Sequence, residues 1–102
     1  MNHVLKGKTN KLKALCKKHH VLSLSLFGSA AGSYTHDNSD IDFLIRFKPS
    51  LSLLNYADNY FDLLESLTLL FNKKIDLVSE KALKNPILIE EINKTKIPVY
   101  EF

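Results

Sequence analysis

The chain lacks several features that would place it in a specialised class of protein. It holds one cysteine, Cys16, so no internal disulfide forms, and no Cys/His cluster has the spacing of a zinc site. No apolar run approaches the roughly 18 residues that cross a membrane, and the basic, polar start of the chain is unlike a secretory leader. We therefore expect a cytoplasmic protein in a reducing compartment, without membrane association.

Nothing in the sequence divides the chain into parts. The 102 residues contain no internal repeat and no low-complexity linker. We expect a single domain spanning residues 1–102, large enough for a hydrophobic core but too short to add a separate substrate domain.

Lysines gather in the first 18 residues, and the net charge is +3. A basic end can indicate nucleic-acid binding. Here the lysines stand between Leu12, Leu15 and Cys16 at helical spacing, which predicts an amphipathic helix from about Thr9 to His19. Interleaved aromatics and Gly-rich turns are absent from this segment, so we interpret it as a solvated helix on a sheet rather than a nucleic-acid site.

Two apolar β-type runs frame the centre of the sequence. The first, Val21 to Phe27, ends at Gly28-Ser29; the second follows a polar loop and has Asp40 and Asp42 at its start. Side chains alternate along a strand, so both carboxylates project from one face and the apolar residues from the other. Like charges this close repel unless a cation or a shared proton lies between them. The pair therefore indicates a site.

The Gly28-Ser29 corner has two interpretations. Glycine lets a ligand approach the backbone, and free N–H groups at a helix start attract phosphate, but an ordinary turn fits the same residues. The spacing favours the phosphate site. Gly-Ser, ten residues, Asp40, one residue and Asp42 would occur by chance in roughly one sequence of this length in a thousand.

A third β-type run, Ile75 to Val78, contains Asp76 among apolar residues. An exposed strand position would explain a single aspartate of this kind. Because Asp40 and Asp42 already define a site, we predict that Asp76 is a third carboxylate reaching the same gap.

The remaining segments predict elements that surround the sheet. From Leu53 to Phe71, apolar side chains at positions 53, 57, 60, 64, 67 and 71 predict a helix with a wide core stripe. Asn85-Pro86 predicts the start of another helix, with Ile87, Leu88 and Ile92 facing inward. Pro98 in the tail predicts a strand at a sheet edge.

Together these motifs resemble the minimal nucleotidyltransferases of the DNA polymerase beta superfamily, which are paired as antitoxins with HEPN-domain toxins. The resemblance lies in L-F-G-S at 26–29, S-D-I-D-F-L-I at 39–45 and K-I-D-L-V at 74–78, and it extends from about residue 21 to the C-terminus. It implies an α/β (α+β) fold, with a mixed sheet of three to four strands and helices packed on one face.

The resemblance also implies roles for single residues. Gly28, Ser29 and Asp40 would bind the nucleotide, and Asp40, Asp42 and Asp76 would hold two Mg²⁺ ions and act in catalysis. ATP is the implied substrate. The implied reaction is transfer of AMP to a tyrosine hydroxyl of a HEPN toxin, within a hetero-oligomer in which this chain is the antitoxin.

One loop departs from the family pattern. Many relatives read G-S-x-A-x-G with basic residues at the x positions, whereas this chain has Ala30 and Gly32 there, and Ser33 replaces the second glycine. The triphosphate charge would then be met by metal, by backbone N–H groups or by the more distant cations Arg46, Lys73 and Lys74.

Two alternatives therefore stay open. The chain could be a binding module that neutralises its HEPN partner by complex formation. It could also be a fragment of a nucleotidyltransferase acting on tRNA or a small molecule, although no acceptor-binding domain is visible in the sequence.

Overall fold

The computed structural model describes residues 5–28 and 40–102. Its elements in chain order are α1 (Thr9–Lys18), β1 (Val21–Phe27), β2 (Ile41–Phe47), α2 (Leu53–Phe71), β3 (Ile75–Ser79), the short 3-10 helix η3 (Glu80–Ala82), α3 (Pro86–Thr95) and β4 (Ile97–Glu101). Within the described ranges, none of the helices combines the length and the hydropathy needed to cross a bilayer.

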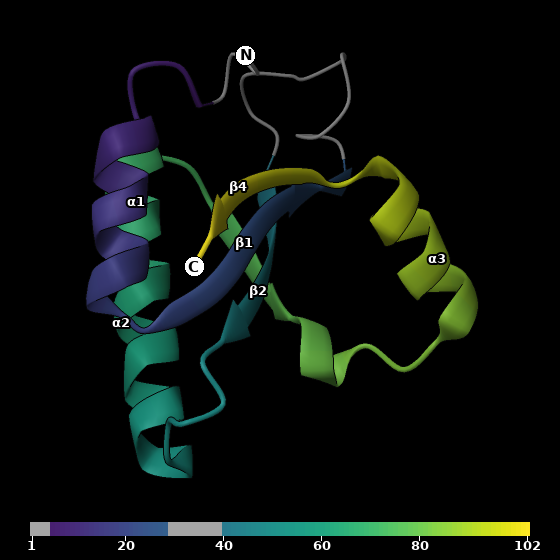
Figure 1. Cartoon of the computed structure of the whole chain (residues 1–102). Helices are drawn as coiled ribbons and strands as arrows, with labels where there is room; N and C mark the ends of the chain where they lie inside the picture. Colours follow the sequence, from purple (N-terminus) through teal and green to yellow (C-terminus); the bar gives the residue numbers. More distant parts are fainter. Residues whose placement is uncertain (1–4, 29–39) are drawn as a thin grey trace.

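The four strands form one mixed sheet in the order β3-β2-β1-β4, which confirms the predicted fold class. β1 runs antiparallel to both β2 and β4, whereas β2 and β3 are parallel. Parallel neighbours need a long crossover, and α2 provides it. The edge strand predicted from Pro98 is β4, which lies beside β1 at one edge of the sheet (Figure 1).

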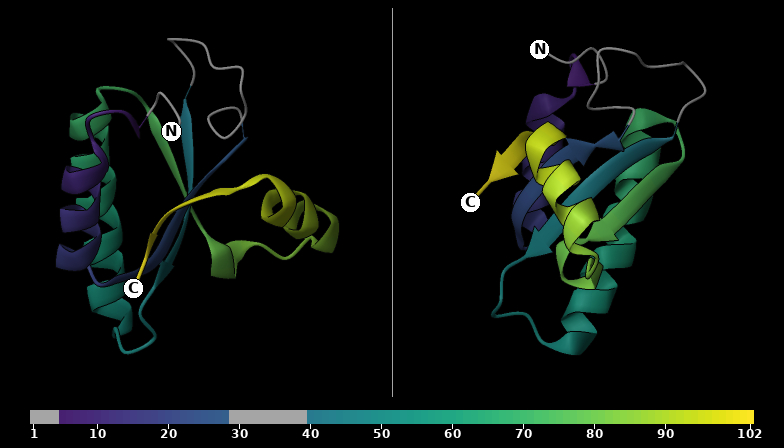
Figure 2. Two further views of the ribbon diagram at one scale, coloured as in Figure 1. Left: turned by 45° about the horizontal axis from the view of Figure 1, so that its top comes forward. Right: turned by 90° about the vertical axis from the view of Figure 1, so that its right-hand side faces the viewer.

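Two of the helices cover one face of the sheet. α1 and α2 lie side by side on it, as the left panel of Figure 2 shows. η3 and α3 lie on the other side, so the prediction that helices pack on one face holds for α1 and α2 and not for α3. The cause is the connection after β3, because η3 leads the chain away from α2.

The main core lies between the sheet and these two helices. Phe43 from β2, Leu12 from α1 and Leu67 from α2 are each 0% exposed, and the rings of Phe43 and Phe71 are 5.7 Å apart. Cys16 is fully buried in the same cluster, as predicted, and burial raises the pKa of its thiol to about 12. A fold of this size depends on such burial for most of its stability.

The predicted core stripe of α2 is shifted. Leu63, Leu67 and Phe71 are buried, whereas Leu53 is 85% exposed and stands outside the core. α2 is 19 residues long, or about 28 Å, and Figure 1 shows its N-terminal end reaching beyond the strands. Its first turn therefore has no sheet to pack on. Ser52 caps this end by accepting a hydrogen bond from the Asn55 N–H at 3.2 Å.

α3 begins where predicted but packs differently. The Asn85 side chain accepts hydrogen bonds from the N–H groups of Ile87 and Leu88, and Pro86 takes the first helical position. Ile92 is buried, but Ile87 and Leu88 are 74% and 47% exposed, so the prediction that all three face inward is wrong for these two. They occupy the first turn, at the end of α3 away from β4.

Candidate active site

Asp42 and Asp76 stand opposite each other on neighbouring strands. They are register partners in the parallel pairing of β2 with β3. The residues on either side of each aspartate, such as Ile41 and Phe43 around Asp42, are buried under α1 and α2. Alternation along the strands therefore directs both carboxyl groups to the face that these helices leave open. The structure thus brings together two of the three predicted carboxylates.

The Asp42 and Asp76 carboxyl groups interact. Burial raises the pKa of Asp42, and the charges of Asp76 and then Asp40 raise it further, as does a side-chain hydrogen bond with Asp76. Two neighbouring carboxylates tend to share a proton or a cation, because their negative charges repel. The electrostatics of the pair thus favour a bound cation or an acid–base role.

Gly28 fits against Asp42. β1 ends beside the start of β2, where Phe27 is the register partner of Asp42. Gly28 follows with φ +67°, in the left-handed region that favours glycine, and a Cβ atom on it would overlap the Asp42 carboxylate. Glycine is therefore favoured here by its backbone conformation, and a larger residue would also have to displace the Asp42 carboxylate. Ser29, the other half of the predicted phosphate corner, lies outside the described residues.

Asp40 lies at the same end of the sheet, directly before β2. The Ile41 N–H donates to the Lys74 carbonyl at 3.0 Å, and Asp40 Oδ2 lies 3.8 Å from Lys74 Nζ. Both side chains are at least half exposed, so the attraction is weak. Lys74 is thus the predicted distant cation that lies near the carboxylates.

Arg46 lies at the other end of β2. It lies four positions after Asp42 along the strand, a distance of about 13 Å. Its Nε atom lies 3.7 Å from Glu80 Oε2. Arg46 therefore lies at the far end of the open face and is not next to Asp42 and Asp76.

The donor set suits a hard metal ion, but it is not a closed metal site. Carboxylate oxygens are the ligands that Mg²⁺ prefers, and the Asp42 carboxylate occupies the space beside Gly28 where another residue would carry its Cβ atom. Across residues 5–28 and 40–102, no three His, Cys, Asp or Glu side chains are grouped closely enough to hold a metal ion. What the described residues show is the pair Asp42 and Asp76, with Asp40 beside it.

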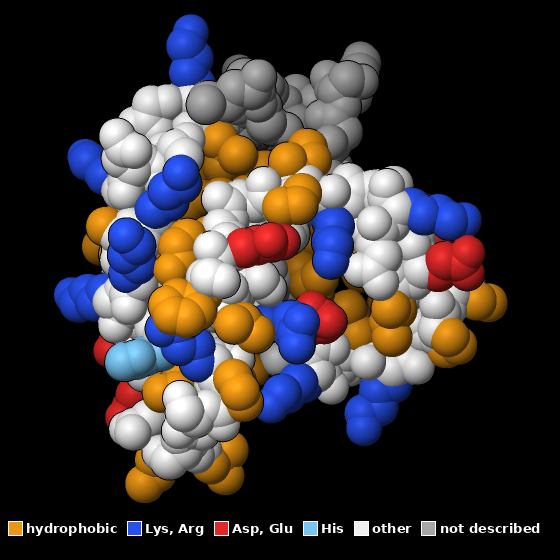
Figure 3. Space-filling view, in the orientation of Figure 1, with side chains coloured by type: hydrophobic (Ala, Val, Ile, Leu, Met, Phe, Trp, Pro, Cys, Tyr) orange, Lys and Arg blue, Asp and Glu red, His pale blue; other side chains and the backbone are white. Residues whose placement is uncertain are grey.

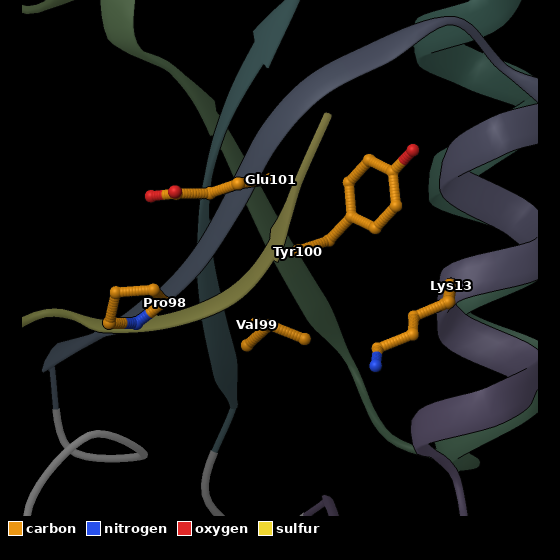
Figure 4. Close-up of a pocket in the computed structure, with 5 residues that line it drawn as sticks. All are labelled: Lys13, Pro98, Val99, Tyr100 and Glu101. Carbon is orange, nitrogen blue, oxygen red and sulfur yellow. The ribbon is translucent and has the colours of Figure 1, made fainter.

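A pocket at the opposite edge of the sheet has a different character. It measures about 370 Å³ and lies between β4 and α1. Figure 4 shows its lining side chains, Lys13, Pro98, Val99, Tyr100 and Glu101. Because β1 and β2 separate β4 from β3, this pocket does not adjoin Asp76. The chemistry of the carboxylates therefore belongs to the β2–β3 side.

Comparison with known families agrees with this geometry. Residues 10–102 match the family described as "Polymerase beta, Nucleotidyltransferase". The chain belongs to this nucleotidyltransferase family. A relative from Methanocaldococcus jannaschii, named "Putative protein adenylyltransferase", is 34% identical over 89 residues, which cover 85% of each chain. The matched range thus includes both strands that carry the aspartates and the Gly28-Ser29 corner.

Solved nucleotidyltransferase structures share the fold. One described as "putative minimal nucleotidyltransferase" is 31% identical, with a TM-score of 0.73, and the match covers 92% of this chain and 91% of that one. A toxin–antitoxin complex with AMP-PNP contains a chain that is 21% identical, with a TM-score of 0.71 and coverages of 93% and 74%. A third structure is a tri-AMPylated Shewanella oneidensis HEPN toxin in complex with MNT antitoxin. Its matching chain is 18% identical, with a TM-score of 0.62, and the match covers 92% of this chain and 70% of that one. At 21% and 18% identity the likeness shows the fold.

Proposed function

We propose that this nucleotidyltransferase is a protein adenylyltransferase, which transfers AMP from ATP to a hydroxyl group of a partner protein. The observation that carries the proposal is the register of Asp42 with Asp76 beside Gly28. Three further facts support it: the family, the adenylyltransferase name of the relative, and the AMPylated toxin in a structural neighbour.

The reaction exchanges one bond at phosphorus. The oxygen of the acceptor hydroxyl attacks the α-phosphorus of ATP in line and forms a P–O bond. The bond between that phosphorus and the oxygen bridging to the β-phosphate breaks, and pyrophosphate leaves with the electron pair. The hydroxyl proton passes to Asp76, whose carboxyl group faces the open side of the sheet.

The residues divide the remaining work. Asp40, Asp42 and Asp76 would hold Mg²⁺, two ions in all, and Gly28 with Ser29 would bind the triphosphate. When bound, the metal supplies positive charge that lowers the pKa of the acceptor hydroxyl and neutralises the departing pyrophosphate. Asp42 would favour a bound cation because its carboxyl group is partly buried beside two other acids, each of which raises its pKa.

The acceptor in this proposal is a tyrosine of a HEPN-domain toxin. Structural neighbours are antitoxins in complexes with toxins, and one of those toxins is AMPylated. Transfer of AMP would then neutralise the toxin, in the cytoplasm and within a hetero-oligomer of the two proteins.

A second function, neutralisation by binding alone, is favoured by one observation. The described carboxylates do not form a group of three at metal-binding distances. In that case the chain would cover its partner without modifying it, and the altered Gly-Ser loop would be the reason for weak nucleotide binding.

The test uses the chain co-expressed with its HEPN-domain partner, ATP labelled at the α-phosphate, and Mg²⁺. The wild-type chain should label the partner, and Asp42→Ala should abolish labelling. Glu91→Ala removes an exposed carboxylate of α3 and is the matched control, with labelling at the wild-type rate. Labelling that persists in Asp42→Ala would remove the catalytic assignment. Neutralisation of the toxin without any labelling would establish the binding module.

A further inference from the structure

β3, the strand that carries Asp76, has a strand neighbour on one side only in the described sheet. It is five residues long and pairs with β2. The pairing places Asp76 directly opposite Asp42, and like charges in opposite positions weaken a strand pair. A strand held along one side can rotate about that line of hydrogen bonds, which would move the Asp76 carboxyl group relative to Asp42. The position of Asp76 therefore depends on what holds the outer side of β3.

Two tyrosines of α2 hold this outer side. The Tyr60 hydroxyl donates to the Leu77 carbonyl, and the Tyr56 hydroxyl donates to Ser79 Oγ at 2.6 Å. Leu77 directly follows Asp76 in the strand. Its side chain and that of Asp76 point to opposite faces of the sheet, but the bond from Tyr60 binds the backbone that both residues share. Tyr60 thus acts on the strand itself, next to the site residue.

The spacing of the two tyrosines matches the spacing of their partners. Tyr56 and Tyr60 are four residues apart, which is a rise of about 6 Å along a helix. Leu77 and Ser79 are two residues apart, which is about 6.6 Å along a strand. The later tyrosine binds the earlier strand residue, so α2 and β3 run antiparallel. Both bonds can therefore form together, and they fix β3 at two points.

Packing and charge keep these hydroxyl groups in place. The Tyr60 ring lies edge-on to the Phe61 ring with the ring centres 5.2 Å apart, and the Tyr56 ring lies edge-on to the Phe47 ring at 4.8 Å. Burial raises the pKa of Tyr60, and the charge of Asp76 raises it further. The Tyr60 hydroxyl is therefore protonated at neutral pH and remains a hydrogen-bond donor to β3.

We infer that Tyr60 is a positioning residue for the AMP transfer, because its bond to the Leu77 carbonyl holds Asp76 opposite Asp42. The inference rests on the proposed function, in which Asp76 accepts the hydroxyl proton and holds metal together with Asp42. The geometry of reacting groups matters strongly for rate, since a displacement of about 1 Å can slow a reaction by about a hundredfold. Tyr60 would contribute to catalysis through the strand that it holds.

A direct role in the reaction does not fit the position of Tyr60. α2 lies on the covered face of the sheet, whereas the Asp76 carboxyl group faces the open side (Figure 2). The hydroxyl of Tyr60 already donates to the Leu77 carbonyl. Loss of this hydroxyl should therefore lower the rate of transfer and leave the affinity for ATP and for the partner unchanged.

The test compares Tyr60→Phe with Tyr100→Phe in the complex with the HEPN-domain partner. Each change removes one hydroxyl and keeps the ring, and Tyr100 belongs to β4, at the opposite edge of the sheet from β3. Labelling rates at varied partner and ATP concentrations give kcat and a KM value for each substrate. We expect Tyr60→Phe to lower kcat about tenfold with both KM values unchanged, and Tyr100→Phe to change none of them. Tyr56→Phe should lower kcat less than Tyr60→Phe, because Ser79 lies farther from Asp76 along the strand.

The other results would each overturn the inference. One is an unchanged kcat in Tyr60→Phe, and another is an equal loss of kcat in Tyr100→Phe or in Tyr56→Phe. A rise in either KM in Tyr60→Phe would mean that Tyr60 contacts a substrate. Circular dichroism at the assay temperature gives the folded fraction of each variant. A loss of kcat no larger than the loss of folded protein would show a role in stability alone.

Hydrogen exchange tests the positioning of β3 without the reaction. In the full chain without ATP, loss of one hydrogen bond should speed exchange of the Asp76 and Val78 amides about fivefold in Tyr60→Phe. Tyr100→Phe should leave their exchange unchanged. If the wild-type chain transfers no AMP, the proposed function fails, and this measurement decides whether Tyr60 holds the strand at Asp76. Exchange at the wild-type rate in Tyr60→Phe would overturn the inference.

Discussion

The two faces of the sheet differ in what they do. The face under α1 and α2 is apolar, with Ile41, Phe43 and Ile45 of β2 all buried. The open face carries Asp42 and Arg46 from the same strand, interleaved with those residues. One strand of seven residues thus contributes to stability on one side and to the candidate chemistry on the other. Substitutions on β2 should separate these two properties.

The basic and acidic helices repeat this contrast on the outer surface. The first 36 residues contain lysines and no acidic residue, and Figure 3 shows lysine side chains spread over α1. α2, which packs beside α1, has acids and no lysine or arginine. The helix that packs against β3, the strand of Asp76, is thus the acidic one.

The largest expected effect on stability comes from the apolar face. Phe43→Ala removes a fully buried ring that packs against Phe71, and should lower the free energy of unfolding by about 3–5 kcal/mol. Leu69→Ala, at an exposed position, is the control and should change it little. Urea denaturation measures both. A loss below about 1 kcal/mol for Phe43→Ala would contradict the division between the two faces.

Gly28→Ala should act where the faces meet. The new Cβ would occupy the space of the Asp42 carboxylate in addition to straining a backbone with φ +67°. Gly7→Ala is the control, because Gly7 has φ +74° and no atom within 4 Å of an added Cβ, so it measures the strain alone, about 1–2 kcal/mol. We expect Gly28→Ala to cost more than Gly7→Ala in thermal unfolding. Equal costs would show that Asp42 yields freely.

Removing a helix cap should have a smaller effect on stability, and it compares α2 with α3 on the opposite side of the sheet. Ser52→Ala removes the cap of α2, which holds much of the core, and should cost about 1 kcal/mol. Asn85→Ala removes the cap of α3, in which Ile92 is the buried residue, so it should fray the helix with less effect on global unfolding. Hydrogen exchange at α3 and urea denaturation together distinguish these outcomes. The reverse order would mean that α3 belongs to the main cooperative unit.

The smallest effect is the pH dependence of the carboxylate pair. Because folding raises the pKa of Asp42, the folded state binds more protons than the unfolded state, and stability should fall as the pH rises above the ordinary aspartate pKa of 3.8. Asp42→Asn should remove this fall, so the variant should become the more stable protein at neutral pH and lose that advantage in acid. Thermal unfolding in metal-free buffer at several pH values measures the difference. A constant difference would argue against a raised pKa.

Local patterns predicted the elements of this fold well. The alternation of I-D-F-L-I-R-F in β2 depends on neighbouring residues, and so do the Asn85-Pro86 start of α3 and the edge strand at Pro98. The buried face of α2 is harder to predict, because apolar residues occur all round the helix. The sequence alone does not show that Leu63 is in the core and Leu53 is not. The buried face is the one that packs on the sheet, and the sheet forms through contacts between residues far apart in the sequence.

The candidate site was predictable only in part. Asp40, Asp42 and Asp76 were expected to meet, and the structure places Asp42 opposite Asp76 with Asp40 beside them; their catalytic roles stay predictions. The hydrogen bond from the Tyr60 hydroxyl to the Leu77 carbonyl was not predicted, because it joins residues 17 apart in the sequence. The sequence offered one signal for this contact. Tyr56 and Tyr60 lie four residues apart on α2, and the edge strand β3 follows.

The outer edges of the sheet are both interrupted. At β3 the Leu77 carbonyl already accepts the Tyr60 hydroxyl, and at β4 Pro98 has no N–H to donate. Neither rim therefore offers an unbroken backbone template on which further strands of other molecules could assemble. Newly made copies should resist edge-to-edge aggregation, even in a crowded solution where many of them collide.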